Sequence, residues 1–357
     1  MFACALLNSQ PMGFYAPSQI IRDAIEHGVD VRPVHINRSK IEHTLAEPEE
    51  ARSAGDHVWP QHADMREDIW SHKPLLLGFS AVIGLSKDAQ EKIVAHRGDG
   101  YDSIRDLWLR TQVPISALEK LAHADAFADL GLSRREALWV VKGLIGTHGA
   151  DTLPLFQAAG EVETEADSES DLPKMLMGEE VIHDYSTLSF SLKGHPLQFI
   201  RPILDARRIT RSNQLGQVKP GNRVEVAGLV LVRQRPGTAK GVIFATLEDE
   251  TGVANVVIWP KVFEQNRKTI LSARMLAVRG QLQREGLVIH IIAEQITDMT
   301  PHLLDLAHGV EIGDRILARG DEGKSGPHPG RDHQAMRAIE QARRQAYAAL
   351  PGGRNFH

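Results

Sequence analysis

Cysteine is almost absent from the chain, whose 357 residues include only Cys4. A single cysteine cannot form an internal disulfide or a thiolate metal site, which agrees with a reducing compartment. No apolar run approaches the roughly 18 residues that a membrane-spanning helix needs, and the first residues lack the basic segment of a signal peptide. We therefore predict a cytoplasmic protein that does not contact a membrane.

An excess of positive charge is also missing. The chain has 41 Lys and Arg residues against 46 Asp and Glu residues, a formal net charge of −5, which by itself argues against a nucleic-acid-binding protein. The acidic residues are unevenly spread, however, because the segment from Glu161 to Asp171 holds six of them and no basic residue. Such a segment repels itself, so residues 160–180 are predicted to form a linker between folded parts.

The sequence lacks the familiar catalytic patterns too. It contains no His-Glu-x-x-His zinc motif, no pair of cysteines and no nucleophile elbow. Its 17 histidines are scattered, and we find no Asp-x-Asp strand to supply the carboxylates of a two-metal site. We predict no catalytic residue and no metal ligand in this chain.

Short helices joined by glycine turns are predicted between residues 75 and 150. Ser86, Ser116 and Ser133 mark three helix starts, and a glutamate three residues after each of the last two is typical of a capping box. Two of the turns lead into a helix N-terminus, whose free N–H groups suit a phosphate. The predicted phosphate-binding residues are Gly84, Leu85, Ser86, Lys87, Gly131, Ser133, Arg134 and Arg135. The alternative is that both turns are ordinary capped corners.

Residues 222–300 are predicted to form three strands, a helix and two more strands, the order of a five-stranded OB barrel. The loop after the first strand carries cations where OB folds bring ligand loops, and two aromatic residues lie on the neighbouring strands. The predicted single-stranded DNA contacts are Arg233, Arg235, Lys240, Phe244, Trp259 and Lys261. The alternative is that the aromatic residues belong to the barrel core and the cations to a solvated surface.

The remaining segments are less regular. Pro17–Gly28 is predicted to be a helix and Val29–Ile36 a strand, followed by an irregular stretch from Lys40 to Ser71. Residues 181–221 are predicted to form a connector, and residues 314–357 are predicted to form a basic, mobile tail. The fold class is a multidomain α+β protein.

Several long segments resemble bacterial C-family DNA polymerases. Phe2–Tyr15 and the following helix resemble the end of the family's fingers region. Three further segments resemble its damage-inducible, error-prone branch: Gly78–Gly98, Leu121–Trp139 and Val230–Gly241. The resemblance extends over residues 1–300 in the family's order.

This resemblance implies distal fingers in residues 1–71, a tandem helix-hairpin-helix region gripping duplex DNA in residues 75–150 and an OB domain near the single-stranded template in residues 222–300. Enzymes of the family add nucleotides to a primer with Mg²⁺, and the error-prone branch does so in translesion synthesis, damage-induced mutagenesis and DNA repair. Its catalytic aspartates lie in a palm domain upstream of these fingers. We therefore expect a carboxy-terminal portion that binds no cofactor and adds no nucleotides alone.

Residues 151–156 resemble the short sliding-clamp motif found between these two domains. The anchors would be Leu153, Leu155 and Phe156, although Thr152 replaces the usual glutamine. The alternative is a hydrophobic segment that docks on its own domain.

Two other functions fit the same pattern. A stand-alone, non-catalytic module could recruit partners, such as other proteins of a mutagenesis complex, to damaged DNA. An OB-bearing RNA-binding protein would prefer single-stranded RNA and would not need the duplex-gripping turns.

Overall fold

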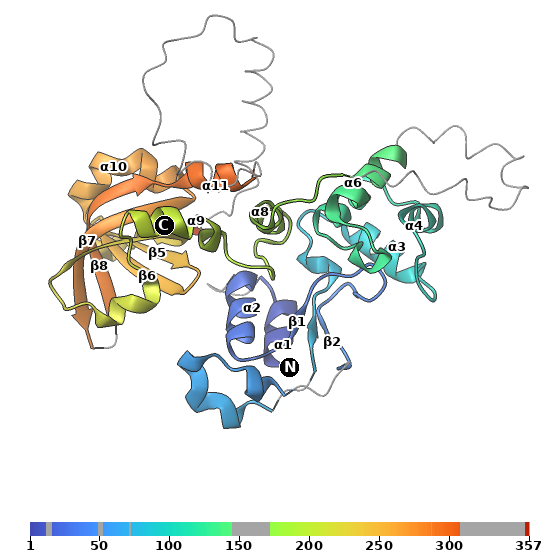
Figure 1. The fold of residues 1–357 in the computed structure, drawn as a ribbon, viewed down its shortest axis with the longest axis horizontal. Coiled ribbons are helices and arrows are strands. Elements are labelled where there is room, and N and C mark those ends of the chain that lie inside the picture. Colours follow the sequence, from blue (N-terminus) through green and yellow to red (C-terminus); the bar gives the residue numbers. More distant parts are fainter. Residues whose placement is uncertain are drawn as a thin grey trace, which may run out of the picture. The chain divides into compact units, whose positions relative to one another are not determined.

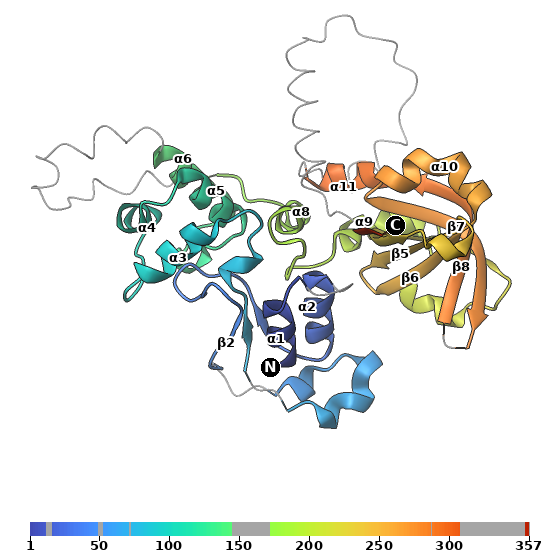
Figure 2. The same cartoon turned by 180° about the vertical axis from the view of Figure 1, so that it is seen from behind.

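A computed structural model describes residues 1–11, 16–48, 53–70, 73–144, 172–286, 288–307 and 354–356. The chain forms two compact units, one of residues 1–175 with 187–192 and one of residues 176–186 with 193–357 (Figures 1 and 2). Each unit is described by itself. Within the described ranges, no helix is both long and apolar enough to cross a membrane.

The first part of unit 1 combines two helices with a small sheet. Helix α1 spans Phe2–Asn8 and α2 spans Pro17–Glu26, which confirms the predicted helix. The central strand β3 (Leu75–Leu76) pairs in parallel with β1 (Val31–Arg32) and antiparallel with β2 (Thr44–Leu45). The predicted strand Val29–Ile36 is thus shorter than expected.

The stretch from Lys40 to Ser71, predicted to be irregular, contains more than loops. Besides β2, it includes the 3₁₀ helices η1 (Ala54–His57) and η2 (Pro60–Asp68). The η2 helix has no buried residue, and η1 buries only Ala54 and Gly55, so neither has the apolar periodicity that a sequence pattern reveals.

A buried histidine connects α1, β2 and the start of the helical part of unit 1. The backbone N–H of Gly78 donates to His43 Nδ1 at 3.2 Å, and the His43 backbone carbonyl accepts from Asn8 Nδ2 at 2.9 Å. Burial lowers the pKa of His43 from 6.5 to about 4, since a charged imidazole would be poorly solvated there. The accepting Nδ1 requires the neutral ring.

This lowered pKa predicts an acid-labile unit 1. In the unfolded chain His43 becomes protonated as the pH falls below its ordinary pKa of 6.5. In the folded chain it stays neutral until the pH approaches its lowered pKa of about 4. Stability is therefore complete above pH 6.5 and falls by up to about 3 kcal/mol toward pH 4. Chemical denaturation at stepped pH should show this slope flattened in His43→Asn, whose amide oxygen can still accept from Gly78. Changing the exposed His96 to Asn should leave the slope as it is.

The second part of unit 1 is helical. After η3 (Phe79–Ala81) come α3 (Lys87–Ala95), α4 (Ile104–Thr111), α5 (Ile115–His123), η4 (Ala128–Leu130) and α6 (Arg134–Gly143). Their apolar faces form one core with α1, α2 and β3, in which Phe79, Leu118 and Phe127 are fully buried.

Two of the three predicted helix starts are confirmed. Ser86 and Ser133 are the N-cap residues of α3 and α6, and Ser133 forms the expected capping box with Glu136. The capping box at Ser116 is wrong, because α5 begins at Ile115 with Pro114 at the N-cap. The fixed φ of proline suits a helix start, so the helix begins before Ser116.

Unit 2 is a closed barrel with helices before and after it. The barrel strands are β4 (Arg223–Gln234), β5 (Ile243–Asp249), β6 (Gly252–Ile258), β7 (Met275–Glu285) and β8 (Val288–Asp298), with η7 (Gly237–Ala239) between β4 and β5 and α10 (Pro260–Ser272) between β6 and β7. The strand order β5-β6-β8-β7-β4 closes through a β4–β5 pairing. This confirms the predicted OB order of three strands, a helix and two strands.

The predicted connector, residues 181–221, is largely helical. It contains most of α8 (Met177–Leu188), whose last two residues belong to unit 1, together with α9 (Pro196–Ala206) and the 3₁₀ helix η6 (Ser212–Gln217). After the barrel, α11 (Thr300–Ala307) packs on α9, and β9 (Arg354–Phe356) pairs in parallel with the end of β4.

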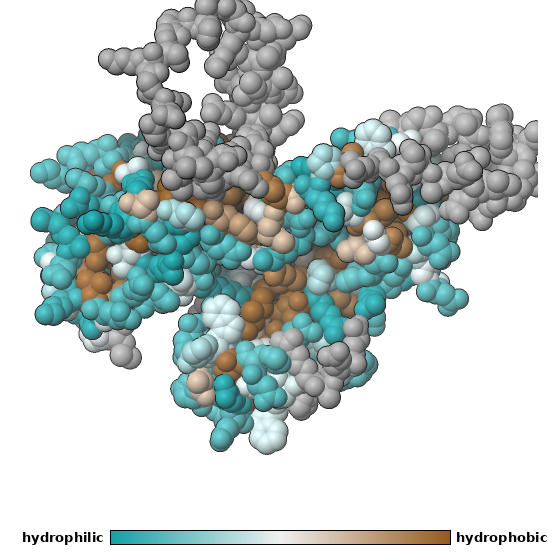
Figure 3. All heavy atoms as spheres, in the orientation of Figure 1, coloured by the Kyte–Doolittle hydropathy of each residue, from teal (hydrophilic) through white to brown (hydrophobic). Residues whose placement is uncertain are grey.

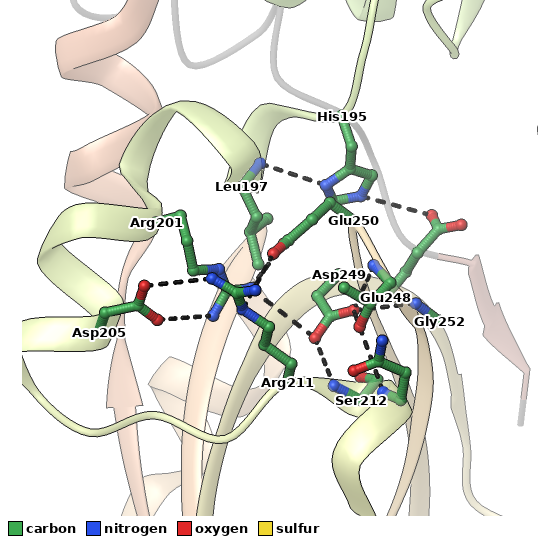
Figure 4. Close-up of polar contacts among 12 residues, drawn as sticks. His195, Leu197, Arg201, Asp205, Arg211, Ser212, Glu248, Asp249, Glu250 and Gly252 are labelled. Carbon is green, nitrogen blue, oxygen red and sulfur yellow. Dashed lines mark hydrogen bonds and ion pairs between the residues drawn. The ribbon is translucent and has the colours of Figure 1, made fainter.

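Buried charges hold the connector to the turn between β5 and β6 (Figure 4). Asp249 is 1% exposed and accepts hydrogen bonds from the backbone N–H groups of Ser212 (2.7 Å), Thr251 (2.8 Å) and Gly252 (2.9 Å). Arg201 of α9 donates to Glu250 at 2.6 Å and lies 3.8 Å from Asp249. The turn Asp249–Gly252 therefore anchors α9 and η6 as well as connecting β5 to β6.

Three predicted segments lie outside the described residues. These are the clamp motif of residues 151–156, residues 160–171 of the predicted linker and the tail from Asp314, apart from residues 354–356. The linker was predicted to continue to residue 180, which is wrong, because α8 begins at Met177.

Candidate nucleic-acid interface

The two glycine turns of unit 1 have the same backbone conformation. Gly84 and Gly131 have φ values of +74° and +75°, in the left-handed region that favours glycine. Two residues later, Ser86 and Ser133 are extended, and each side chain accepts from the third amide of its helix, Ala89 N–H at 3.3 Å and Glu136 N–H at 3.4 Å. Each turn therefore brings the first backbone amides of a helix to the surface. These amides have no partner within their own helix.

The two turns differ in charge. At the second turn, the Ser133 N–H donates to Glu136 Oε2 at 2.7 Å, so a carboxylate lies at the start of α6. Hydrogen bonds from the Ser133 side chain and backbone lower the pKa of Glu136, which keeps it ionised. A negative charge there already interacts with the helix N-terminus and repels a phosphate.

The first turn has no such carboxylate. The residue equivalent to Glu136 is Ala89, which is buried in the core. Lys87 has a side chain that is 82% exposed and lies 3.7 Å from Glu91 Oε1 in a solvent-exposed ion pair, and Lys120 donates to the Gly84 carbonyl oxygen. Although Asp88 stands in the same helical turn, it pairs with Lys92 at 2.9 Å. The first turn therefore suits a phosphate better than the second does.

Two of the residues predicted at these turns have side chains that cannot reach a ligand. Arg134 is 2% exposed and lies 4.0 Å from Asp125. It shares with Ala137 and Val141 the face of α6 that packs into the core, which explains its burial. Leu85 is also a core residue, so only its backbone remains available. Arg135 is half-buried and donates to the Pro173 carbonyl oxygen.

The prediction for Arg233 on the barrel is wrong as well. We expected a loop cation, but β4 continues to Gln234, and an irregularity in the register between Val230 and Val232 places Arg233 opposite the core residue Ala245, so that it points inward. Arg233 is 6% exposed and donates to the Ala273 carbonyl oxygen at the end of α10. It supports the barrel and does not face a ligand.

The other barrel residues lie on the surface. Arg235, Lys240 and Lys261 are exposed, and the Arg235 guanidinium lies 5.3 Å from the centre of the Phe263 ring. Phe244 is 38% exposed and Trp259 is 52% exposed, so the alternative that they form the barrel core is wrong. Phe244 lies between the buried Ile243 and Ala245, whereas Trp259 caps α10. Figure 3, in the orientation of Figure 1, shows hydrophilic side chains over most of the visible surface, with several hydrophobic patches between them.

Lys120 and Glu136 were missed as functional residues. Glu136 was visible in the sequence as half of a capping box, but its effect on phosphate binding follows only from the position of its carboxylate. No sequence pattern indicated Lys120, which lies 36 residues from the turn that it contacts. In the parts of the chain that the structure describes, no group of three or more His, Cys, Asp and Glu side chains could hold a metal ion.

The glycine turns of unit 1 and the closed barrel of unit 2 each match a known family. Residues 28–137 match the helix-hairpin-helix motif family, and residues 224–299 match the family described as OB-fold nucleic acid binding domain. Both matched regions contain the surfaces described above. The chain therefore carries a helix-hairpin-helix region followed by an OB-fold nucleic-acid-binding domain.

Relatives that align with the whole chain give a more specific comparison than these two regional matches. The chain is 45% identical to "Error-prone DNA polymerase" of Sinorhizobium medicae, 44% identical to "Error-prone DNA polymerase 1" of Rhizobium meliloti and 43% identical to "Error-prone DNA polymerase" of Ruegeria pomeroyi. Each alignment covers 100% of this chain but only 29–33% of the relative. The chain thus spans about a third of the length of these polymerases and matches their carboxy-terminal part, which confirms the resemblance predicted from the motifs.

Proposed function

We propose that this chain is the DNA-binding portion of an error-prone DNA polymerase that acts in translesion synthesis. The first glycine turn and the start of α3 hold a backbone phosphate of duplex DNA, and the barrel holds the single-stranded template. The observation that carries this proposal is the pair of matching turns, of which the first combines exposed helix amides with Lys87. The full-length relatives named above support the link to a polymerase.

Nucleotide addition is proposed to depend on residues that this chain does not supply. In the proposed enzyme, aspartates of a palm domain would hold Mg²⁺, which would supply the activation of the primer end, and the residues of this chain hold and orient DNA. Phosphate contacts of this kind fix the register of DNA without reading its sequence.

Primer extension, measured together with a binding titration, tests whether this chain binds DNA without adding nucleotides. The purified chain is mixed with primed DNA, Mg²⁺ and deoxynucleotides, and a second sample is titrated with the same DNA. We expect binding without extension. Extension that survives complete removal of host polymerases would contradict the proposed dependence on a palm, and absence of binding would contradict the function itself.

Changing Glu136 to Gln tests the difference between the two turns. Glutamine can still accept from the Ser133 N–H, so the capping box is kept while the negative charge is lost. We expect a roughly two- to fivefold gain in duplex affinity, because a carboxylate at a helix N-terminus no longer opposes the phosphate. Fluorescence anisotropy at low salt measures the gain. The exposed Glu67 of η2 provides a control away from both turns, and Glu67→Gln should change the affinity less.

Clamp binding remains a prediction, since Leu153, Leu155 and Phe156 lie outside the described residues. Clamp pull-down with Phe156→Ala tests it. Loss of capture with unchanged DNA affinity is the expected result, and retained capture would contradict it.

A further inference from the structure

A buried amide side chain holds the peptide that follows Gly84. Gln90 lies in the first part of α3 and is only 7% exposed. Its Nε2 donates to the backbone carbonyl oxygen of Leu85 at 3.0 Å, and this hydrogen bond is itself buried. Glutamine is seldom buried unless its polar atoms have partners, so the contact with Leu85 explains why an amide is tolerated at this position.

The neighbouring carbonyl group of the turn also has a partner. Lys120 donates to the carbonyl oxygen of Gly84. The N–H of Leu85 donates to the Val82 carbonyl oxygen at 3.2 Å, which closes a β-turn with Gly84 as its third residue. The φ of +74° at Gly84 is the value that a type II turn requires there. The carbonyl oxygens of Gly84 and Leu85 therefore both accept hydrogen bonds from side chains of this chain.

The hydrogen bond from Gln90 determines where the next backbone amide points. The carbonyl of Leu85 and the N–H of Ser86 belong to one planar trans peptide, so the two groups point in opposite directions. Because Gln90 holds the carbonyl on the buried side, the Ser86 N–H is directed away from the core. Ser86 is exposed, and within the described parts of the chain its N–H donates to no other group. The turn thus presents a free donor at the surface.

The second turn lacks this arrangement. The residue at the position of Gln90 is Ala137, a core residue whose side chain has no polar atom. The amide equivalent to that of Ser86 belongs to Ser133, and it donates to Glu136. Two turns of the same backbone conformation therefore differ at the same amide, which is free in the first turn and occupied in the second.

We propose that Gln90 is a positioning residue of the phosphate site at the first turn. It does not touch DNA. It holds the peptide between Leu85 and Ser86 so that the Ser86 N–H donates to the same phosphate that Lys87 contacts. This inference rests on the proposed function and adds the residue that directs one of the donors. A hydrogen bond weakens steeply when its donor is misaligned, so rotation of this one peptide is enough to lose the contact.

Gln90→Met tests this role, because methionine has a similar length and fills the same space but has no donor. The Leu85 peptide is then free to rotate, and duplex affinity should fall about tenfold, as expected for one lost hydrogen bond to a charged group. Lys87 keeps its contact, so the salt dependence of binding should keep its slope. Fluorescence anisotropy with the full chain at several salt concentrations measures both quantities.

Gln112 provides the matched control within the same unit. Its Nε2 also donates to a backbone carbonyl oxygen near a helix end, that of Leu109 at 2.9 Å. Gln112→Met removes the same kind of hydrogen bond away from the first turn. It should change neither the duplex affinity nor its salt dependence.

A second measurement follows the Ser86 amide directly. Labelling leucine with ¹³C at the carbonyl and serine with ¹⁵N selects the serines that follow a leucine, which are Ser86, Ser133, Ser189 and Ser272. In the wild-type chain, a short duplex should shift the Ser86 amide resonance more than that of Ser133. In Gln90→Met, the Ser86 resonance should no longer respond to the duplex. The other three resonances should keep their positions, which reports an intact fold.

Three results would overturn the inference while the wild-type chain still binds duplex DNA. Unchanged affinity in Gln90→Met, or a Ser86 resonance that still responds to the duplex, would mean that this peptide does not depend on Gln90. A Ser133 resonance displaced in the variant without DNA would mean that Gln90 supports the helical region as a whole. Absence of duplex binding by the wild-type chain would instead overturn the proposed function.

Discussion

Replacing Gly84 by valine is expected to reduce the affinity for duplex DNA at least tenfold. Gly84 has φ +74°, a conformation that a β-branched residue avoids, so the turn before α3 must change shape. The amides at the start of α3 and the nearby Lys87 then no longer face the same phosphate. Fluorescence anisotropy with a short duplex measures the loss.

Gly131 provides a closely matched control for this prediction. Its φ of +75° is nearly the same and a Cβ there would meet no atom within 4 Å, so valine should strain the backbone of both turns similarly. Because Glu136 already occupies the start of α6, Gly131→Val should reduce duplex affinity by less than threefold. A larger loss at Gly131 than at Gly84 would contradict the assignment of the phosphate site to the first turn.

Replacing Asp249 by alanine is expected to destabilise unit 2 by about 3–5 kcal/mol, the range observed when one member of a buried charge network is removed. The backbone N–H groups of Ser212, Thr251 and Gly252 would lose their acceptor, and Arg201 would lose a nearby countercharge. Hydrogen exchange of the β5 and β6 amides across a urea series measures the loss in unit 2 separately from unit 1.

The exposed ion pair between Arg223 and Glu294 is the control for this experiment. Its atoms are 2.9 Å apart, but solvent screens them, so Glu294→Ala should destabilise unit 2 far less than Asp249→Ala does. Equal losses for Asp249→Ala and Glu294→Ala would mean that the buried network does not hold α9 and η6 to the barrel.

Local chemistry could be predicted well from the sequence. The starts of α3 and α6 follow from a serine before an apolar pattern, because the serine side chain accepts from an amide only three residues away. The barrel order follows from alternating strands and one helix. Each of these features depends on residues that are neighbours along the chain.

Features that depend on distant residues could not be predicted in this way. Arg233 looked like a loop cation because neither the last residues of β4 nor the register shift between Val230 and Val232 was visible in the sequence, and that shift reverses the side to which Arg233 points. Arg134 looked exposed until α6 was seen to pack that side into the core. The acid-sensitive position of His43 likewise depends on Asn8 and Gly78, each about 35 residues away.

The most direct test of a phosphate site at the first turn is the salt dependence of duplex binding in Lys87→Ala. The logarithm of affinity is measured against the logarithm of salt concentration for the wild-type chain and the variant. Loss of one phosphate contact predicts weaker binding at every DNA sequence and a slope reduced by about one. A variant with unchanged affinity and slope would contradict the site.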